Sequence, residues 1–164
     1  MIIFRIALYL ATMNKQIEII QKPRFFLLDV VHDLSNEQLN KIPDGFNNNI
    51  IWNLAHMIAT QQGVCYIRAG LPKVVGEAFW QTYTSGTKPT DIVNSDEVEN
   101  IKKLFISTMD QLVTDYNNQI FSNYAAWTTR SGIELRNIDE ALSFIPMHEG
   151  LHVGYIMALK RVVK

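Results

Sequence analysis

The sequence predicts an all-α protein, and more specifically a four-helix bundle with long connections after the second and third helices. Four long segments carry apolar residues at a spacing of three to four, which is typical of helices with one buried face. Neither an alternation of strands with helices nor an internal repeat interrupts this pattern. With 164 residues, the chain is long enough to bury one sizeable core, so we expect a single domain over residues 13–164.

Composition and charge argue against several classes of protein. The chain carries 15 basic and 16 acidic residues, a formal net charge of −1, which is unlike a nucleic-acid-binding protein with a broad basic surface. No stretch of about 18 uncharged apolar residues predicts a membrane span. The single cysteine, Cys65, excludes an internal disulfide and is typical of a reducing compartment. We therefore expect a cytoplasmic protein whose partners include neither nucleic acid nor a membrane.

Residues 1–12 leave two interpretations open. They are largely apolar, but Arg5 interrupts the run and no basic segment precedes it, so they would make a poor signal peptide. Alternatively, they are an N-terminal extension or the result of a mis-assigned start, with Met13 as the true first residue, because the regular helical pattern begins there. The expectation of a cytoplasmic protein favours the second interpretation.

The first helix is expected between residues 14 and 34, where apolar residues recur at the helical spacing. Pro23 lies inside this segment, so the helix either starts near Pro23 after a short extra turn or bends there. Ser35, followed three residues later by Gln38, has the form of a capping box and predicts a short turn of helix. Residues 43–45, Pro-Asp-Gly, predict a turn in the chain.

The second long helix is expected over residues 50–69, with an N-cap among the three asparagines at 47–49 and an end at Gly70. One stripe along this helix combines an aromatic ring, a histidine and small residues that let a neighbouring helix approach closely. This stripe consists of Trp52, Ala55, His56, Ala59 and Gly63.

The two long connections flank the third helix. Residues 73–90 contain glycine and proline with aromatic residues between them, which is typical of a long connection anchored by its aromatic side chains. The third helix is expected to begin at Asn94 or Ser95, with acidic residues in its first turn that favour the helix dipole. Residues 117–137 are polar and irregular, and they predict a hairpin or an ordered loop.

The fourth helix carries a pair of histidines. It is expected over residues 140–161, capped by Asp139 and bent at Pro146, because the proline ring blocks one backbone hydrogen bond. His148 and His152 follow the proline. Residues at i and i+4 share one face of an α-helix, so these two imidazoles can bind the same metal ion.

A third histidine, His56, lies on the stripe of the second helix that faces the protein interior. Burying three imidazoles without partners is costly, and one divalent metal ion would satisfy all three. The alternative is that they are hydrogen-bonded core histidines without a metal. The spacing of the residues alone leaves both interpretations open.

These segments resemble the DinB-like superfamily of four-helix bundles, which includes YfiT-type and thiol-transferase groups. The resemblance is carried by residues 49–58 of the second helix and residues 148–156 of the fourth, and it extends from about Lys15 to Lys160. It implies a bundle of this family over residues 13–164, pairing into a homodimer, and one divalent metal ion, most often zinc or nickel. The residues that match the family's ligands are His56, His148 and His152.

Two hypotheses about function follow from this site. Three neutral histidines leave at least one coordination position open, as in catalytic rather than structural zinc sites. The resemblance implies that the metal activates a low-molecular-weight thiol, so we expect a metal-dependent thiol transferase or hydrolase acting on a small electrophilic substrate. The alternative is a non-catalytic, metal-stabilised and stress-related bundle that binds a ligand or a partner.

Side chains near the histidines are candidates for the walls of a pocket. Asn53 either orients His56 or a bound water, or makes an ordinary polar contact with a loop. Aromatic residues at such positions line a pocket or belong to the core. The candidates are Trp52, Asn53 and Tyr155, together with Trp80, Tyr83 and Trp127.

Three other residues with reactive side chains are not assigned to catalysis. Glu149 follows His148 and points about 100° away from it around the helix, so it is expected to be a solvated or supporting carboxylate rather than a general base. Cys65 is expected to be a small buried residue. His32 is expected at the surface near the end of the first helix.

Overall fold

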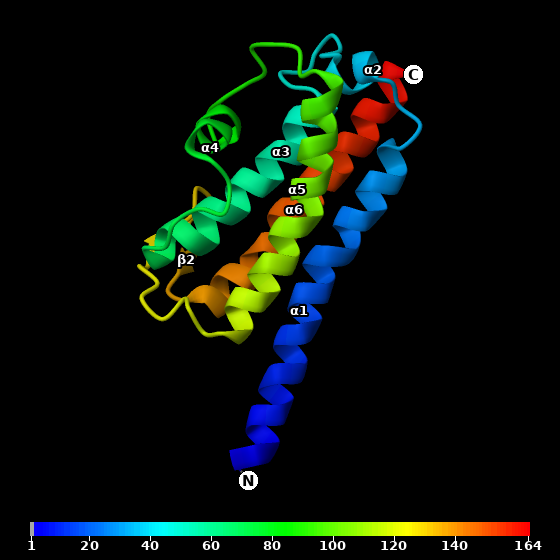
Figure 1. Cartoon of the computed structure of the whole chain (residues 1–164). Coiled ribbons are helices and arrows are strands. Elements are labelled where there is room, and N and C mark those ends of the chain that lie inside the picture. Colours follow the sequence, from blue (N-terminus) through cyan, green and yellow to red (C-terminus); the bar gives the residue numbers. More distant parts are fainter. Residues whose placement is uncertain (1) are drawn as a thin grey trace.

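The computed structural model describes the backbone of residues 2–164 and the side chains of residues 15–164. Its frame is a bundle of four long helices (Figure 1), which confirms the predicted all-α fold. The long connections follow the second and third of these helices, as predicted. The four helices are α1 (Ile2–Val31), α3 (Ile50–Gln61), α5 (Ser95–Asn117) and α6 (Ile138–Val163).

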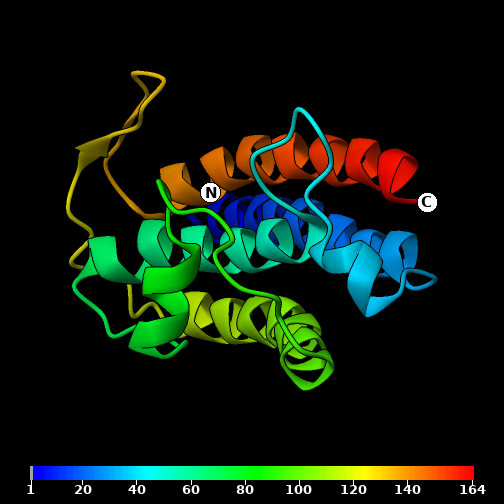
Figure 2. The same cartoon turned by 90° about the horizontal axis from the view of Figure 1, so that it is seen from above.

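The packing of the bundle places α3 against α6. Both α1 and α3 pack against α5 and α6, and in Figure 2 α5 and α6 lie on opposite sides of the other two helices. Helices α1 and α6 run in one direction, whereas α3 and α5 run in the other (Figure 1). Because α3 and α5 are parallel, the chain between them must return along the bundle, which explains the long connection after α3.

Helix α1 differs from the expectation at its N-terminal end. It begins at Ile2 rather than near residue 14, and it runs through Pro23 without a break. Buried residues on both sides of the proline, Ile20 and Leu27, hold the helix against the bundle. This packing offsets the roughly 3 kcal/mol that an internal proline costs a helix.

The structure does not describe the side chains of residues 1–12, so the two interpretations of this segment fall outside the described residues. Within the described part of the chain, no helix combines the length and the apolar character needed to cross a bilayer.

Side-chain caps define the beginnings of the next two helices. The capping box is present at α2 (Asn36–Asn40): the Ser35 hydroxyl accepts a hydrogen bond from the Gln38 N–H, and the Gln38 side chain accepts one from the Ser35 N–H. Asn49 caps α3, since its side-chain oxygen accepts a hydrogen bond from the Trp52 N–H at 2.8 Å. Both caps agree with the sequence analysis.

The second long helix changes type before it ends. Helix α3 continues into a π-helical turn, η1 (Gln62–Tyr66), and then into a 3₁₀ turn, η2 (Ile67–Ala69). The chain leaves the helix at Gly70, which has a φ of 70° that favours glycine. The predicted extent of 50–69 is confirmed, but its last turns are not α-helical. Wide π-helical turns are frequent at functional sites.

The connection after α3 contains a short helix that the sequence analysis does not predict. This helix, α4 (Glu77–Tyr83), is 7 residues long and packs Phe79 and Trp80 against the core. A helix of this length between Gly76 and Gly86 is too short to give a periodic signal. The aromatic anchors themselves agree with the prediction.

The connection after α5 forms a small hairpin, as one of the two predicted alternatives. Strand β1 (Trp127–Thr128) pairs antiparallel with β2 (Glu134–Leu135). Before it, α5 is capped by Asn94, whose side chain accepts a hydrogen bond from the Glu97 N–H at 2.9 Å.

Helix α6 is capped by Asn137 and not by Asp139. The Asn137 side chain accepts a hydrogen bond from the Glu140 N–H at 2.9 Å. Asp139 therefore lies inside the first turn, where its negative charge still favours the helix dipole. The helix continues through Pro146 without interruption.

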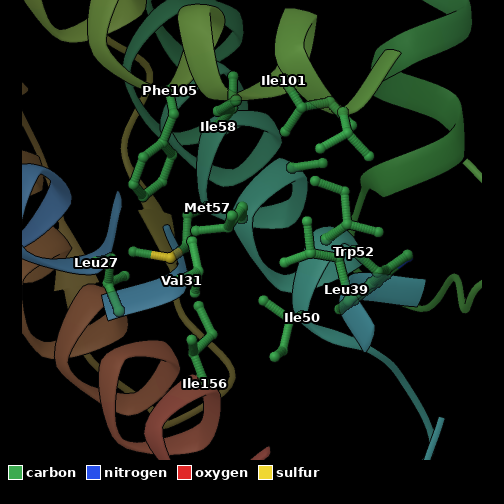
Figure 3. Packing of buried hydrophobic residues seen from close by; sticks show 14 of the residues in the cluster. Leu27, Val31, Leu39, Ile50, Trp52, Met57, Ile58, Ile101, Phe105 and Ile156 are labelled. Carbon is green, nitrogen blue, oxygen red and sulfur yellow. The ribbon is translucent and has the colours of Figure 1, made fainter. Parts of the chain in front are cut away.

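Two apolar clusters form the core. The larger cluster joins α2 to all four long helices, and Figure 3 shows how its side chains interdigitate. The smaller cluster fills the other end of the bundle, beneath η1 and the hairpin. Residues of the larger cluster include Leu27, Ile58, Phe105 and Ile156. Residues of the smaller cluster include Ile20, Val64, Met109 and Ile145.

A buried polar layer separates the two clusters. It consists of one residue from each long helix: Arg24, Gln61, Thr108 and Glu149. In the sequence of each helix, a residue of one cluster precedes this polar residue and a residue of the other cluster follows it. The side chain of Gln61 is connected to Thr108, because its amide donates to the Thr108 main-chain oxygen at 2.9 Å.

Arg24 is the centre of this polar layer. Its guanidinium forms an ion pair with Glu149 at 2.7 Å and donates to the main-chain oxygens of Phe105 and Met57 at 2.9 and 3.4 Å. Arg24 is 0 % exposed and Glu149 is 2 % exposed. Burial raises the pKa of Glu149, and the guanidinium opposes that rise. One side chain on α1 thus contacts the other three long helices.

Replacing Arg24 with methionine should lower the free energy of unfolding by about 3–5 kcal/mol, because the Glu149 carboxylate would stay buried without its partner. The double replacement Arg24→Met and Glu149→Met should cost less than the single one, since no uncompensated charge remains. Urea denaturation measures both. Glu134→Gln, which breaks an exposed pair with Arg136, is the control and should have little effect. If Arg24→Met lowers the free energy of unfolding no more than Glu134→Gln does, the buried ion pair does not have this role.

Candidate metal centre

Three histidines meet where α3 packs against α6. His56 belongs to α3 and is 6 % exposed. His148 and His152 belong to successive turns of α6 and are partly exposed. One ring nitrogen from each histidine lies within 4.8 Å of the other two. The structure thus brings together the three residues that the sequence analysis proposes as ligands.

The spacing of the ring nitrogens suits a single ion. The Nε2 atoms of His148 and His152 are 3.3 Å apart. Two nitrogens bound to one tetrahedral zinc ion, each at about 2.05 Å, would also be separated by about 3.3 Å. The Nε2 atom of His56 faces the same point, because the hydroxyl of Thr60 lies 3.3 Å from it and 3.5 Å from the Nε2 atom of His148.

The orientation of His56 is set by a backbone carbonyl and a tryptophan. Its Nδ1 donates a hydrogen bond to the main-chain oxygen of Tyr83, at the end of α4, at 2.7 Å. A carbonyl can only accept, so Nδ1 carries the hydrogen and Nε2 keeps its lone pair. The ring of Trp52 lies flat on the imidazole, with ring centres 4.7 Å apart and an interplanar angle of 8°.

Asn53 orients His152 in the same way. The Nδ1 of His152 donates to the side-chain oxygen of Asn53 at 2.8 Å. The amide nitrogen of Asn53 donates in turn to the Asn49 main-chain oxygen and the Asn48 side chain, which turns the amide oxygen toward the histidine. Asn53 therefore orients His152 on α6, and not His56 as expected, and it also makes the expected polar contact with a loop, at Asn48. Metal-binding histidines usually have such a partner on the second ring nitrogen.

Burial favours the neutral form of all three imidazoles. Burial lowers the pKa of His56, although the hydrogen bond to Tyr83 opposes this. Burial also lowers the pKa of His148 to about 3 and that of His152 to about 4, and repulsion from neighbouring histidines adds to both effects. Neutral imidazole is the form that binds a metal ion.

A cavity of about 490 Å³ opens onto two of the histidines, His56 and His148. Its walls come from α3, the turns η1 and η2, α4 and the segment after it, the hairpin and α6. Trp80 and Trp127, which are among the predicted wall residues, line it. A volume of this size is within the range of small-molecule sites. The three-histidine cluster is thus reachable by a small molecule.

Comparison with known families agrees with this geometry. A family model described as the DinB superfamily matches residues 26–156, which include all three histidines. The chain belongs to the DinB superfamily. A comparison with curated protein sequences gave no match. Membership of the DinB superfamily and the three-histidine cluster together fit a metal-binding protein.

None of the three residues expected to line the pocket is in the described wall of this cavity of the DinB-superfamily fold. Trp52 is stacked on His56, and Asn53 is bonded to His152. Tyr155 lies nearly one turn beyond His152, at the level of the larger core cluster, where it packs edge-on against Phe46 with ring centres 5.4 Å apart.

Thr60 is a residue near the site that the sequence analysis misses. It lies four residues after His56 on the same face of the helix, and that spacing is the signal that could have indicated it. Its hydroxyl contacts the Nε2 atoms of both His56 and His148, and it lines the cavity.

The three residues not assigned to catalysis have clear positions in this DinB-superfamily protein. Glu149 is in the buried ion pair with Arg24, so of the two expected alternatives the solvated carboxylate is wrong; as a supporting carboxylate, Glu149 acts on the packing of α6. Cys65 is fully buried, and burial raises the pKa of its thiol to about 12, which confirms a packing role. His32 is exposed, as predicted.

Replacing Asn53 with alanine should weaken zinc binding by roughly 10- to 100-fold, because His152 would lose the partner that fixes its ring. Competition with a chromogenic chelator measures the affinity, and circular dichroism checks that the helices persist. Asn47→Ala, an exposed asparagine in the same segment, is the matched control and should bind zinc like the parent. Equal affinities of the two variants would show that Asn53 does not support the site.

Proposed function

We propose that this protein binds one divalent metal ion, zinc or nickel, through His56, His148 and His152, and that the ion activates a thiol or a water molecule for transfer to, or hydrolysis of, a small electrophile. The observation that carries the proposal is the convergence of three imidazoles, two of which, His56 and His148, line a cavity. A divalent ion held there supplies a Lewis acid that lowers the pKa of a thiol or water.

The hydrogen bonds of the site support one preferred ring orientation. The carbonyl of Tyr83 and the amide of Asn53 hold the Nδ1 hydrogens of His56 and His152, so the Nε2 lone pairs remain available for a ligand bond. The low pKa values of His148 and His152, about 3 and about 4, mean that few protons compete with the ion at neutral pH.

The cavity supports a catalytic use of the metal over a purely structural one. Three protein ligands leave a coordination position open, whereas structural zinc sites are closed by four. His56, His148 and Thr60 all line the cavity, so a small molecule can reach that position. The Thr60 hydroxyl lies between two of the ligands and can form a hydrogen bond with a group that enters there. A bundle in which the metal ion only stabilises the fold would not need this access.

Elemental analysis of protein purified without a histidine tag should find about one equivalent of zinc or nickel, since a three-histidine set binds one ion. His148→Ala and His152→Ala should lose most of this metal. His32→Ala, which removes the exposed histidine, is the control and should retain it.

Absence of metal from a folded parent protein, even after zinc and nickel are offered, would overturn the proposal. The metal-loaded parent should then consume a chromogenic electrophile in the presence of a small thiol, or hydrolyse it, and the metal-free protein should not. Full metal occupancy without either reaction would favour the non-catalytic alternative.

A further inference from the structure

The cavity beside the three histidines has an unusual charge for this protein. The chain as a whole is nearly balanced, with 15 basic and 16 acidic residues. The described lining of the cavity, however, includes Arg68 and Arg130 and no aspartate or glutamate. Within the described part of the chain, neither arginine forms an ion pair with a carboxylate. The described lining of the cavity therefore carries positive charge and no negative charge.

Arg68 is positioned by stacking. Its guanidinium lies over the ring of Trp127, with its central carbon 4.5 Å from the ring centre. Its main-chain oxygen accepts a hydrogen bond from the Ala125 N–H at 2.6 Å, which ties turn η2 to the segment before the hairpin. A guanidinium stacked in this way keeps its N–H groups free at the edges, where they can bind an anion.

The second arginine, Arg130, comes from the turn of the hairpin. The neighbouring Thr129 is buried, and its hydroxyl accepts a hydrogen bond from the Ile133 N–H at 3.0 Å, so the turn has an ordered conformation. The rest of the cavity includes large apolar surfaces from Trp80, Trp127 and Phe144. The cavity thus combines cationic groups, aromatic walls and, at one side, the histidines.

We propose that this cavity binds a small organic carboxylate, with the carboxylate group on Arg68 and Arg130 and an apolar body between Trp80, Trp127 and Phe144. Arginine pairs with carboxylates through two parallel hydrogen bonds, and the aromatic walls suit an organic acid better than a bare inorganic anion. The inference rests on the proposed function in one respect, namely that the acid is the electrophilic substrate or the thiol presented to the metal. Its binding to the arginines needs no metal.

Benzoate, its neutral analogue benzamide and inorganic phosphate are suitable probes. Each is titrated into zinc-loaded and metal-free protein while the indole N–H signals of the three tryptophans are followed by NMR. Benzoate should shift the signals of Trp80 and Trp127 in both forms of the protein. Benzamide and phosphate should bind at least about tenfold more weakly, because each lacks either the charge or the apolar body.

Arg68→Gln and Arg130→Gln should each weaken benzoate binding by about tenfold, the usual effect of losing one charge-assisted hydrogen bond. Arg136→Gln is the matched control: this arginine is exposed, is paired with Glu134 and lies outside the cavity lining, so benzoate binding should not change.

Four results would overturn the inference. Equal binding of benzoate and benzamide would show that the cavity does not recognise the charge. Tighter binding of phosphate than of benzoate would show that the cavity does not recognise the apolar body. Benzoate binding that needs zinc but neither arginine would place the anion on the metal instead. The metal content of each sample is measured in parallel. Full zinc occupancy without benzoate binding would refute this inference alone, whereas benzoate binding without zinc uptake would refute the proposed function alone.

Discussion

A fully buried arginine must find all its partners inside the protein, and in this bundle Arg24 finds them on the other three long helices. The ion pair with Glu149 is the shortest of these contacts, at 2.7 Å with both side chains almost inaccessible to solvent. Desolvation cancels much of the stabilisation that such a pair would provide. We infer that the pair favours one arrangement of the helices, because any other rotation of α6 about its axis would leave the arginine unpaired.

The same ion pair determines how the histidines are presented. Glu149 lies between His148 and His152 on α6, so the rotation that directs it to Arg24 also fixes the directions of both histidines, which lie toward α3. Two hydrogen bonds then fix the orientation of the rings. The side chain of Asn53 on α3 accepts one from His152, and the end of α4 accepts one from His56. The connections after α3 and α5, which the bundle needs for its topology, supply the walls of the cavity.

Local patterns in the sequence predict the long helices and the three histidines well, because periodicity and i, i+4 spacing are properties of neighbouring residues. They predict the 7-residue helix α4 poorly, since it is too short to show a period. The cap of α6 is ambiguous because Asn137 and Asp139 are both good caps. Local patterns cannot predict the contacts that orient the helices and the histidines, because the partners are distant in the sequence. Arg24 and Glu149 are 125 residues apart, and Asn53 and His152 are 99 apart. Such pairs are defined only when the helices pack.

The central claim is that the three histidines bind one metal ion and leave a position open toward the cavity. X-ray absorption spectroscopy of the zinc-loaded protein tests it most directly, because it reports the number and type of ligands. The account predicts three imidazole nitrogens at about 2.0–2.1 Å together with at least one further light ligand that exogenous thiol or azide can replace. Two or fewer imidazoles, or a closed set of four protein ligands that exogenous ligands cannot displace, would contradict it.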